Sequence, residues 1–174
     1  MLGERIAVNC ELEWDNLGNA VHGFLAADWP SQTVQQRRAV ADRLLQAWSV
    51  AGAIAADDVL AMADRLWHWV DQRWPQAERH REWPVAMRAQ DGSQWTGVAD
   101  LVLGLGDRLV LIDHKTFPGS PGQAVEAAER YWGQLNAYRR MLQAATSKPV
   151  VEAYVHFPVL GIAVPLIFDQ EDAP

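Results

Sequence analysis

The chain has 174 residues, the size of one ordinary globular domain. Its formal net charge is −7, which argues against binding nucleic acid or an anionic membrane through bulk charge alone. An apolar fraction of 49% excludes extensive disorder, and a single cysteine, Cys10, excludes an internal disulfide and a cysteine-ligated zinc or iron–sulfur site. The sequence has neither a long apolar run nor a signal-peptide pattern, so we expect a cytoplasmic location and no membrane contact.

Apolar residues at three- and four-residue steps predict that the first 75 residues are mostly helical. Asp15 or Asn16 can cap the first helix, Ser31 can cap the second, and Pro30 and Pro75 end the first and third. The predicted helices cover residues 17–29, 31–50 and 57–74. Five of the nine tryptophans fall at core spacing along this segment, which favours packing over base stacking: Trp29, Trp48, Trp67, Trp69 and Trp74.

After residue 75 the spacing of apolar residues changes to the two-residue period of strands, and turns are predicted at Asp91-Gly92 and Gly106-Asp107. The expected strands cover residues 82–89, 95–103, 109–112, 150–157 and 162–168, with a loop at 117–122 and a long helix at 123–145. This order predicts an α/β (or α+β) fold, in which a mixed sheet core at 79–168 is flanked by helices and preceded by the helical segment 1–75. We expect one domain over 1–174.

A two-residue hairpin loop at Gly106-Asp107 sets Leu101 opposite Ile112 and therefore Asp100 opposite Asp113. Two facing carboxylates on a buried strand pair repel each other. A divalent cation between them removes this conflict, and Mg²⁺ is the natural candidate because one or two carboxylates commonly hold it.

Lys115 is one of only two lysines and follows Asp113 by two residues, so both side chains lie on one face of the strand. An ammonium beside a metal-bound phosphate can position a water and neutralise charge in the transition state. The alternative is a surface hairpin with solvated charges, but the apolar run 109–112 indicates a buried strand. The imidazole of His114 should point to the opposite face.

Four segments together resemble the RecB-like subgroup of the PD-(D/E)xK nucleases. They are Gly97-Val98-Ala99-Asp100, Asp113-His114-Lys115, Gln134-Leu135-Asn136-Ala137-Tyr138, and a histidine, His22, on the first helix. The resemblance spans about residues 17–140 and implies a restriction-endonuclease-like core. It also implies the nuclease domain of a RecB- or AddA-type helicase–nuclease of the UvrD/Rep superfamily, so the chain is expected to be a fragment of a longer protein.

The resemblance implies roles for these positions. Asp100, Asp113, His22 and the backbone carbonyl of His114 would hold Mg²⁺ or Mn²⁺, and Lys115 would orient or activate the attacking water. Gln134 and Tyr138 would contact DNA or hold the motif strands, with simple helix packing as an equal alternative.

Four further positions are weaker candidates. Glu82 resembles a glutamate that precedes this hairpin in relatives, yet a two-residue Asp91-Gly92 turn would place Trp83 opposite Asp100. Trp132 is a candidate for stacking on a nucleotide. Arg79 and Arg81 are expected to be solvated, with phosphate contact as the alternative.

Other nucleotide sites are excluded, since Gly104 and Gly106 precede a strand rather than a helix and no Gly-Lys-Ser/Thr loop provides an ATP site. The expected function is a metal-dependent DNA nuclease, an exodeoxyribonuclease in double-strand-break repair and recombination. A helicase in cis, with or without a partner protein, would deliver a single strand. The alternatives are a catalytically silent module for DNA guiding or subunit docking, and an independent small nuclease.

Overall fold

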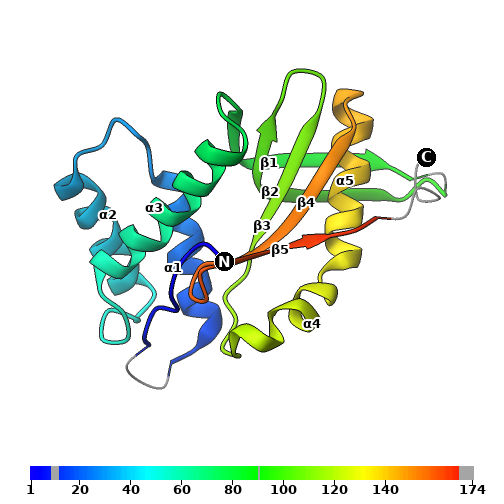
Figure 1. The fold of residues 1–174 in the computed structure, drawn as a ribbon. Coiled ribbons are helices and arrows are strands. Elements are labelled where there is room, and N and C mark those ends of the chain that lie inside the picture. The colour runs from blue at the N-terminus through cyan, green and yellow to red at the C-terminus, as the bar shows by residue number, and fades with distance from the viewer. Residues whose placement is uncertain (9–11, 90, 169–174) are drawn as a thin grey trace.

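The computed structural model describes residues 1–8, 12–89 and 91–168; the predictions made for Cys10 lie outside them. Three helices come first, a five-stranded sheet follows, and one short and one long helix connect its third and fourth strands (Figure 1). The elements are α1 (Trp14–Ala27), α2 (Val34–Ala47), α3 (Ala56–Arg73), β1 (Glu78–Arg88), β2 (Gln94–Gly104), β3 (Leu109–His114), η1 (Pro121–Gln123), α4 (Ala124–Glu129), α5 (Trp132–Thr146), β4 (Val150–Phe157) and β5 (Ile162–Leu166).

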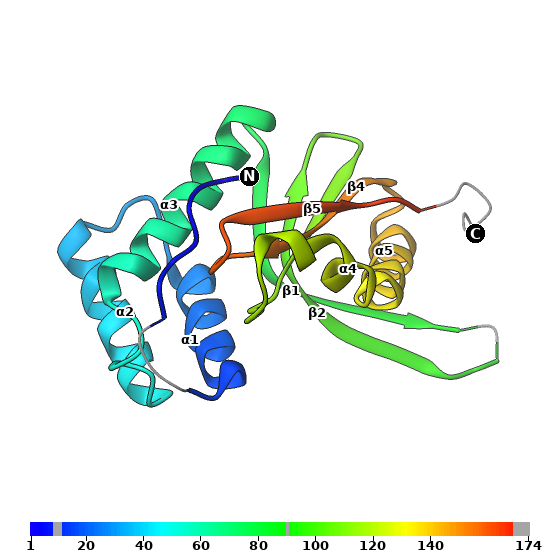
Figure 2. The same cartoon turned by 60° about the horizontal axis from the view of Figure 1, so that its bottom comes forward.

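The sheet is mixed and has the order β1-β2-β3-β4-β5. Only β3 and β4 run parallel, because the α4–α5 segment connects them. Helices α1 to α3 lie on one side and α4 and α5 on the other (Figure 2), so each side encloses an apolar core. The fold class expected from the sequence is therefore confirmed.

The helix boundaries differ from the predicted ones at their caps. The first helix begins at Trp14 with Glu13 as its N-cap, so Asp15 and Asn16 lie inside the first turn and do not cap it. Thr33 rather than Ser31 caps α2, through a reciprocal capping box with Gln36. In the part of the chain that the structure describes, none of the helices has both the length and the apolar character needed to cross a bilayer.

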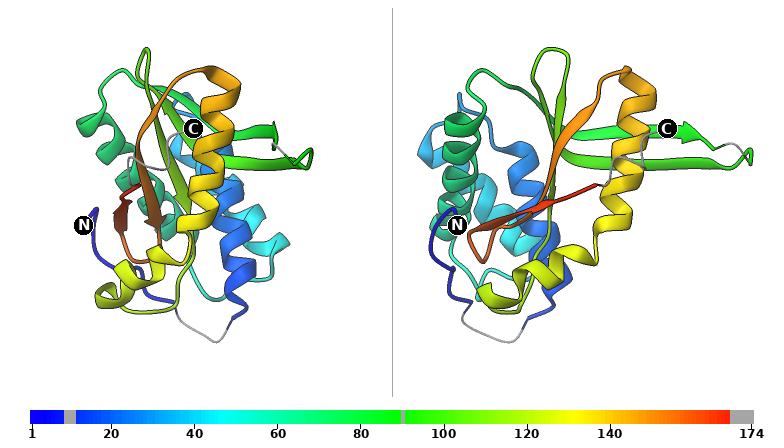
Figure 3. Two further views of the ribbon diagram at one scale, coloured as in Figure 1. Left: turned by 90° about the vertical axis from the view of Figure 1, so that its right-hand side faces the viewer. Right: turned by 45° about the vertical axis from the view of Figure 1, so that its right-hand side comes forward.

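The long helix predicted at 123–145 is broken into α4 and α5 around Arg130 and Tyr131. The break lets the two halves follow different directions (Figure 3). Helix α4 packs near β5, whereas α5 packs mainly on β1 and also contacts β2, β3 and β4. Packing against two parts of a twisted sheet thus overrides local helix propensity.

The hairpin of β1 and β2 projects well beyond the other strands (Figure 2). Trp83 pairs with Ala99, and Ala89 bonds to Ser93 around a loop that contains Gly92 at φ 85°. The connection is therefore a three-residue loop. The predicted pairing of Trp83 with Asp100 was wrong by one residue.

Both strands of this hairpin change faces at Glu82 and Asp100. Arg81 contacts Trp67 on the α3 side, whereas Trp83 packs in the core on the α5 side. Likewise, Leu101 and Ala99 belong to opposite cores. Glu82 has a left-handed φ of 48°, a conformation that breaks strand alternation.

Candidate metal and active site

The strand register brings Asp100 and Asp113 side by side. The predicted β2–β3 pairs are observed from Gly104–Leu109 to Leu101–Ile112, and the next residues are the two aspartates. Gly106 has φ 73°, as the first central position of a type II′ turn requires. This short turn fixes the register and so positions both carboxylates.

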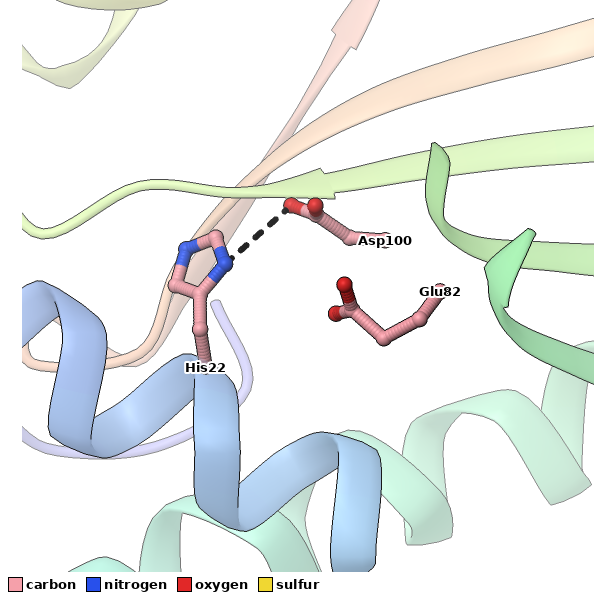
Figure 4. A group of neighbouring side chains, drawn as sticks. All are labelled: His22, Glu82 and Asp100. Carbon is pink, nitrogen blue, oxygen red and sulfur yellow. Dashed lines mark ion pairs between the residues drawn. The ribbon is translucent and has the colours of Figure 1, made fainter. Parts of the chain in front are cut away.

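Helix α1 adds His22 to the end of β3. Its Nε2 lies 2.6 Å from the backbone carbonyl oxygen of His114, and its Nδ1 lies 3.7 Å from Oδ2 of Asp100 (Figure 4). The backbone N–H of His114 donates to the same Oδ2 at 2.7 Å. A carbonyl and a carboxylate from two strands therefore lie beside the two nitrogens of one helix imidazole.

Glu82 joins this group because of the change of face in β1. Ligand atoms of His22, Glu82 and Asp100 all lie within 4.8 Å of one another, and Figure 4 shows the three side chains converging. Asp113 is not part of this set of three. The signal that could have placed Glu82 was the hairpin loop length, which decides whether residue 82 or 83 lies opposite Asp100.

Asp113 and Lys115 form an ion pair beside this group. Lys115 Nζ lies 2.7 Å from Oδ2 of Asp113, while Asp113 is only 1% exposed. Its carboxylate oxygens have no aligned hydrogen bond among the described residues. Burial, together with the nearby charge of Asp100, raises the pKa of Asp113 to about 6.

The surrounding groups show the same effect of burial. Burial raises the pKa of Asp100, with His22 opposing this shift. Burial acts to lower the pKa of Lys115, but the Asp113 carboxylate outweighs it and the net shift is upward. The site thus keeps Lys115 protonated while it disfavours two adjacent negative charges.

The imidazole of His114 takes no part in the carboxylate group. Its Nδ1 lies 3.0 Å from Nδ1 of His156, and both side chains are buried. Burial lowers the pKa of His114 well below its usual value and that of His156 to about 3. This neutral pair supports the end of β3 from the face opposite Asp113.

Two contacts that sequence reasoning missed shape the access to the site. Gly18 lets α1 approach the segment that follows β3, since a Cβ there would lie 2.8 Å from Oγ1 of Thr116. The ring of Tyr131, at the α4–α5 break, lies 5.2 Å from Lys115 Nζ. With His22 they line a surface cavity of about 410 Å³.

The motif residues of α5 lie on the hairpin beside the site. Gln134 Nε2 donates to the Tyr138 hydroxyl at 3.1 Å, and the Tyr138 ring covers Gly97 so closely that a Cβ there would lie 2.5 Å from Cε1. Trp132 donates to the backbone carbonyl of Ile167 at 3.1 Å and packs near Phe168. The structure therefore gives Tyr138 and Trp132 packing contacts.

The residues present fit a hard divalent cation. Three carboxylates and a backbone carbonyl are the oxygen donors that Mg²⁺ and Mn²⁺ prefer, and one imidazole is compatible with Mn²⁺. The buried Asp113 carboxylate, which lacks aligned hydrogen bonds within the described part of the chain, is the kind of group that a cation would compensate. The structure thus contains a possible metal site at His22, Glu82 and Asp100.

Comparisons with known proteins agree with this geometry. The family model of the PD-(D/E)XK nuclease superfamily matches residues 3–171. The chain is 30% identical over 125 residues to an ATP-dependent helicase/nuclease protein of Desulforudis audaxviator, covering 70% of this chain and 10% of that protein. It is 31% identical over 160 residues to the protein of the same name from Enterococcus faecalis, covering 80% of this chain and 13% of the relative. The chain thus spans about a tenth of these relatives.

Proposed function

This chain belongs to the PD-(D/E)XK nuclease superfamily, and from that premise we propose that it is a metal-dependent deoxyribonuclease module acting with a helicase. The observation that carries the proposal is the convergence of His22, Asp100 and the His114 carbonyl at the end of β3. These groups come from separate elements, so the convergence is a property of the whole fold. Phosphodiester hydrolysis is the reaction that such a site supports.

Each residue has a distinct task in this reaction. Mg²⁺ or Mn²⁺ would be held by Asp100, Asp113, His22, Glu82 and the His114 carbonyl, and would there polarise the phosphate and lower the pKa of a bound water. Lys115 carries a fixed positive charge beside Asp113. It orients the attacking water and stabilises the negative charge that develops on the phosphate oxygens.

The substrate we propose is a DNA strand delivered by a motor. A net charge of −7 gives the domain little electrostatic attraction for DNA of its own. The relatives are named as helicase/nuclease proteins, and the chain covers only 10% and 13% of their lengths. A helicase in cis would supply a single strand during double-strand-break repair and recombination, inside the cytoplasm.

The test is DNA cleavage by the purified protein with linear and circular DNA in Mg²⁺ or Mn²⁺. The variants Asp113→Ala and Lys115→Ala should lose cleavage by at least about a hundredfold, as loss of transition-state stabilisation predicts. Lys148→Ala is the matched control, because Lys148 is the other lysine and lies outside the site, and it should cleave normally. Cleavage of circular DNA would identify endonuclease action.

The alternative function, a silent module that guides DNA or docks another protein, predicts a different result. Wild type and both variants would then be equally inert with either metal, while DNA binding persisted. That outcome would refute the nuclease proposal. A silent module also gives no physical reason to keep Asp113 buried next to Asp100, where both pKa values are raised.

A further inference from the structure

Arg81, the residue before Glu82, is a cation held in an unusual place. Its guanidinium lies between two indole rings, 4.5 Å from the centroid of Trp29 and 4.6 Å from that of Trp67. Its Nε and Nη1 are buried and have no hydrogen-bond partner among the described residues. Buried guanidinium nitrogens without hydrogen-bond partners are costly, so an expectation of simple solvation does not fully describe the half-buried Arg81.

The neighbouring acids are already engaged by other cations. Asp28 accepts from Arg37 at 2.6 Å and from the indole N–H of Trp67 at 2.8 Å. Asp71 pairs with Arg79. The positive charge of Arg81 is therefore the one in this cluster without a direct acidic contact in the described structure.

Trp29 gives this cluster an exposed aromatic face. Tryptophan spacing predicted that Trp29 packs in the core, but the residue is 56% exposed. Trp29, Arg79 and Arg81 line a surface cavity of about 470 Å³. A cation and an exposed indole side by side match the two parts of a nucleotide, a phosphate and a base.

We propose that Arg81 and Trp29 form a second contact for the DNA strand, in which Arg81 binds a backbone phosphate and Trp29 stacks on a base. The inference rests on the proposed nuclease function. It follows from position: Arg81 directly precedes Glu82 of the metal group, and Trp29 follows α1, which carries His22. A strand with one phosphate at the metal group would reach this cluster with a neighbouring nucleotide.

The test measures binding of a fluorescent single-stranded oligonucleotide to the Asp113→Asn protein in Mg²⁺, so that cleavage does not interfere. Adding Trp29→Ala should weaken binding by about 5- to 100-fold, the range for loss of one base stack. Adding Arg81→Gln should weaken binding. It should also reduce the magnitude of the slope of log K against log salt concentration by about 0.7, the value for one lost phosphate contact on a single strand. Trp48→Ala is the matched control, since Trp48 is also exposed, at 38%, and should change binding by less than about twofold, because no stacking contact is lost.

Several outcomes would overturn the proposal. One is unchanged binding in the Trp29→Ala protein. Because Trp29 is exposed, its replacement should not prevent folding, so this result decides the question even if the Arg81→Gln protein fails to fold. Another is an equal loss in the Trp29→Ala and Trp48→Ala proteins. A third is displacement of the labelled oligonucleotide by inorganic phosphate alone, with an affinity equal to that of the unlabelled oligonucleotide, which would assign the site to free phosphate.

A small diester, bis(p-nitrophenyl) phosphate, separates this inference from the proposed function. It has no neighbouring phosphate, so Trp29→Ala in the otherwise native chain should hydrolyse it at the wild-type rate. The Trp29→Ala protein should show a raised KM only for the oligonucleotide and not for the small diester. If the wild type hydrolyses no diester at all, the nuclease proposal fails, while the binding experiment still decides whether Arg81 and Trp29 contact DNA.

Discussion

Nε2 of His22 lies 2.6 Å from the backbone carbonyl oxygen of His114, so a helix side chain meets the end of a central strand. Nδ1 of the same ring lies 3.7 Å from Oδ2 of Asp100, so each ring nitrogen of His22 faces an oxygen atom. An imidazole beside a carbonyl and a carboxylate is a donor set that suits a divalent cation.

His22→Ala should weaken Mn²⁺ binding by at least about tenfold, the lower range for loss of a group that holds or orients a metal. Isothermal titration calorimetry measures the affinity. His68→Ala is the control, because His68 is exposed on α3 away from the carboxylates, and it should bind Mn²⁺ like wild type. Equal affinity of all three proteins would show that His22 is not a ligand.

Asp113→Asn should stabilise the metal-free protein at about pH 8. The pKa of Asp113 is raised from 3.8 to about 6 by burial and by Asp100, so its ionisation as pH rises through 6 destabilises the folded state. Asparagine removes this cost, and the melting temperature in EDTA should rise by a few degrees. Below about pH 4 the carboxyl is neutral in both the folded and unfolded states, so the gain from ionisation disappears.

Added Mn²⁺ should give the wild type the higher melting temperature of the two proteins, because the cation stabilises the wild type and binds the Asp113→Asn protein poorly. Asp42→Asn, at an exposed position on α2, controls for the loss of one negative charge. A lower melting temperature of Asp113→Asn in EDTA at the same alkaline pH would contradict the raised pKa.

His156 should make the protein less stable as the solution becomes acidic. Its pKa is lowered by burial from 6.5 to about 3, so below about pH 6.5 the unfolded chain binds a proton that the folded chain does not. That contribution is fully present above about pH 6.5 and is lost as pH falls. Replacing His156 with Asn should reduce the slope of unfolding free energy against pH by about 1.4 kcal/mol per unit between about pH 6 and 5.

Urea denaturation at several pH values measures this slope. An unchanged slope in the His156→Asn protein would mean that His156 is protonated in the folded state.

Gly97→Ala should destabilise the protein by about 1–3 kcal/mol, because the new Cβ would lie 2.5 Å from Cε1 of Tyr138 and force the ring to move. Gly133→Ala is the matched control: it lies in α5 with nothing within 4 Å of the added Cβ. This second change should stabilise by about 0.5–1 kcal/mol. Thermal unfolding compares the two, and equal effects would rule out the close packing of Tyr138 on β2.

The β2–β3 register could be predicted because its turn is local. Gly106 favours one two-residue loop, and a loop of known length fixes every pair that follows. The same reasoning failed at β1–β2, where the loop has three residues, and the one-residue error moved Glu82 away from Asp100. The predicted helix 123–145 failed for a related reason, since its break at Arg130 and Tyr131 serves packing on distant strands.

The sequence by itself determined the kinds of residue available for the chemistry, namely two aspartates and a lysine on adjacent strands and a histidine on the first helix. Periodicity and turn chemistry act over a few residues, so they could specify those strands. Only the tertiary structure decided that Glu82 joins His22 and Asp100, that Asp113 pairs with Lys115, and that Arg81 lies between Trp29 and Trp67. These contacts depend on how distant helices and a bent hairpin pack together, and local propensity does not encode that packing.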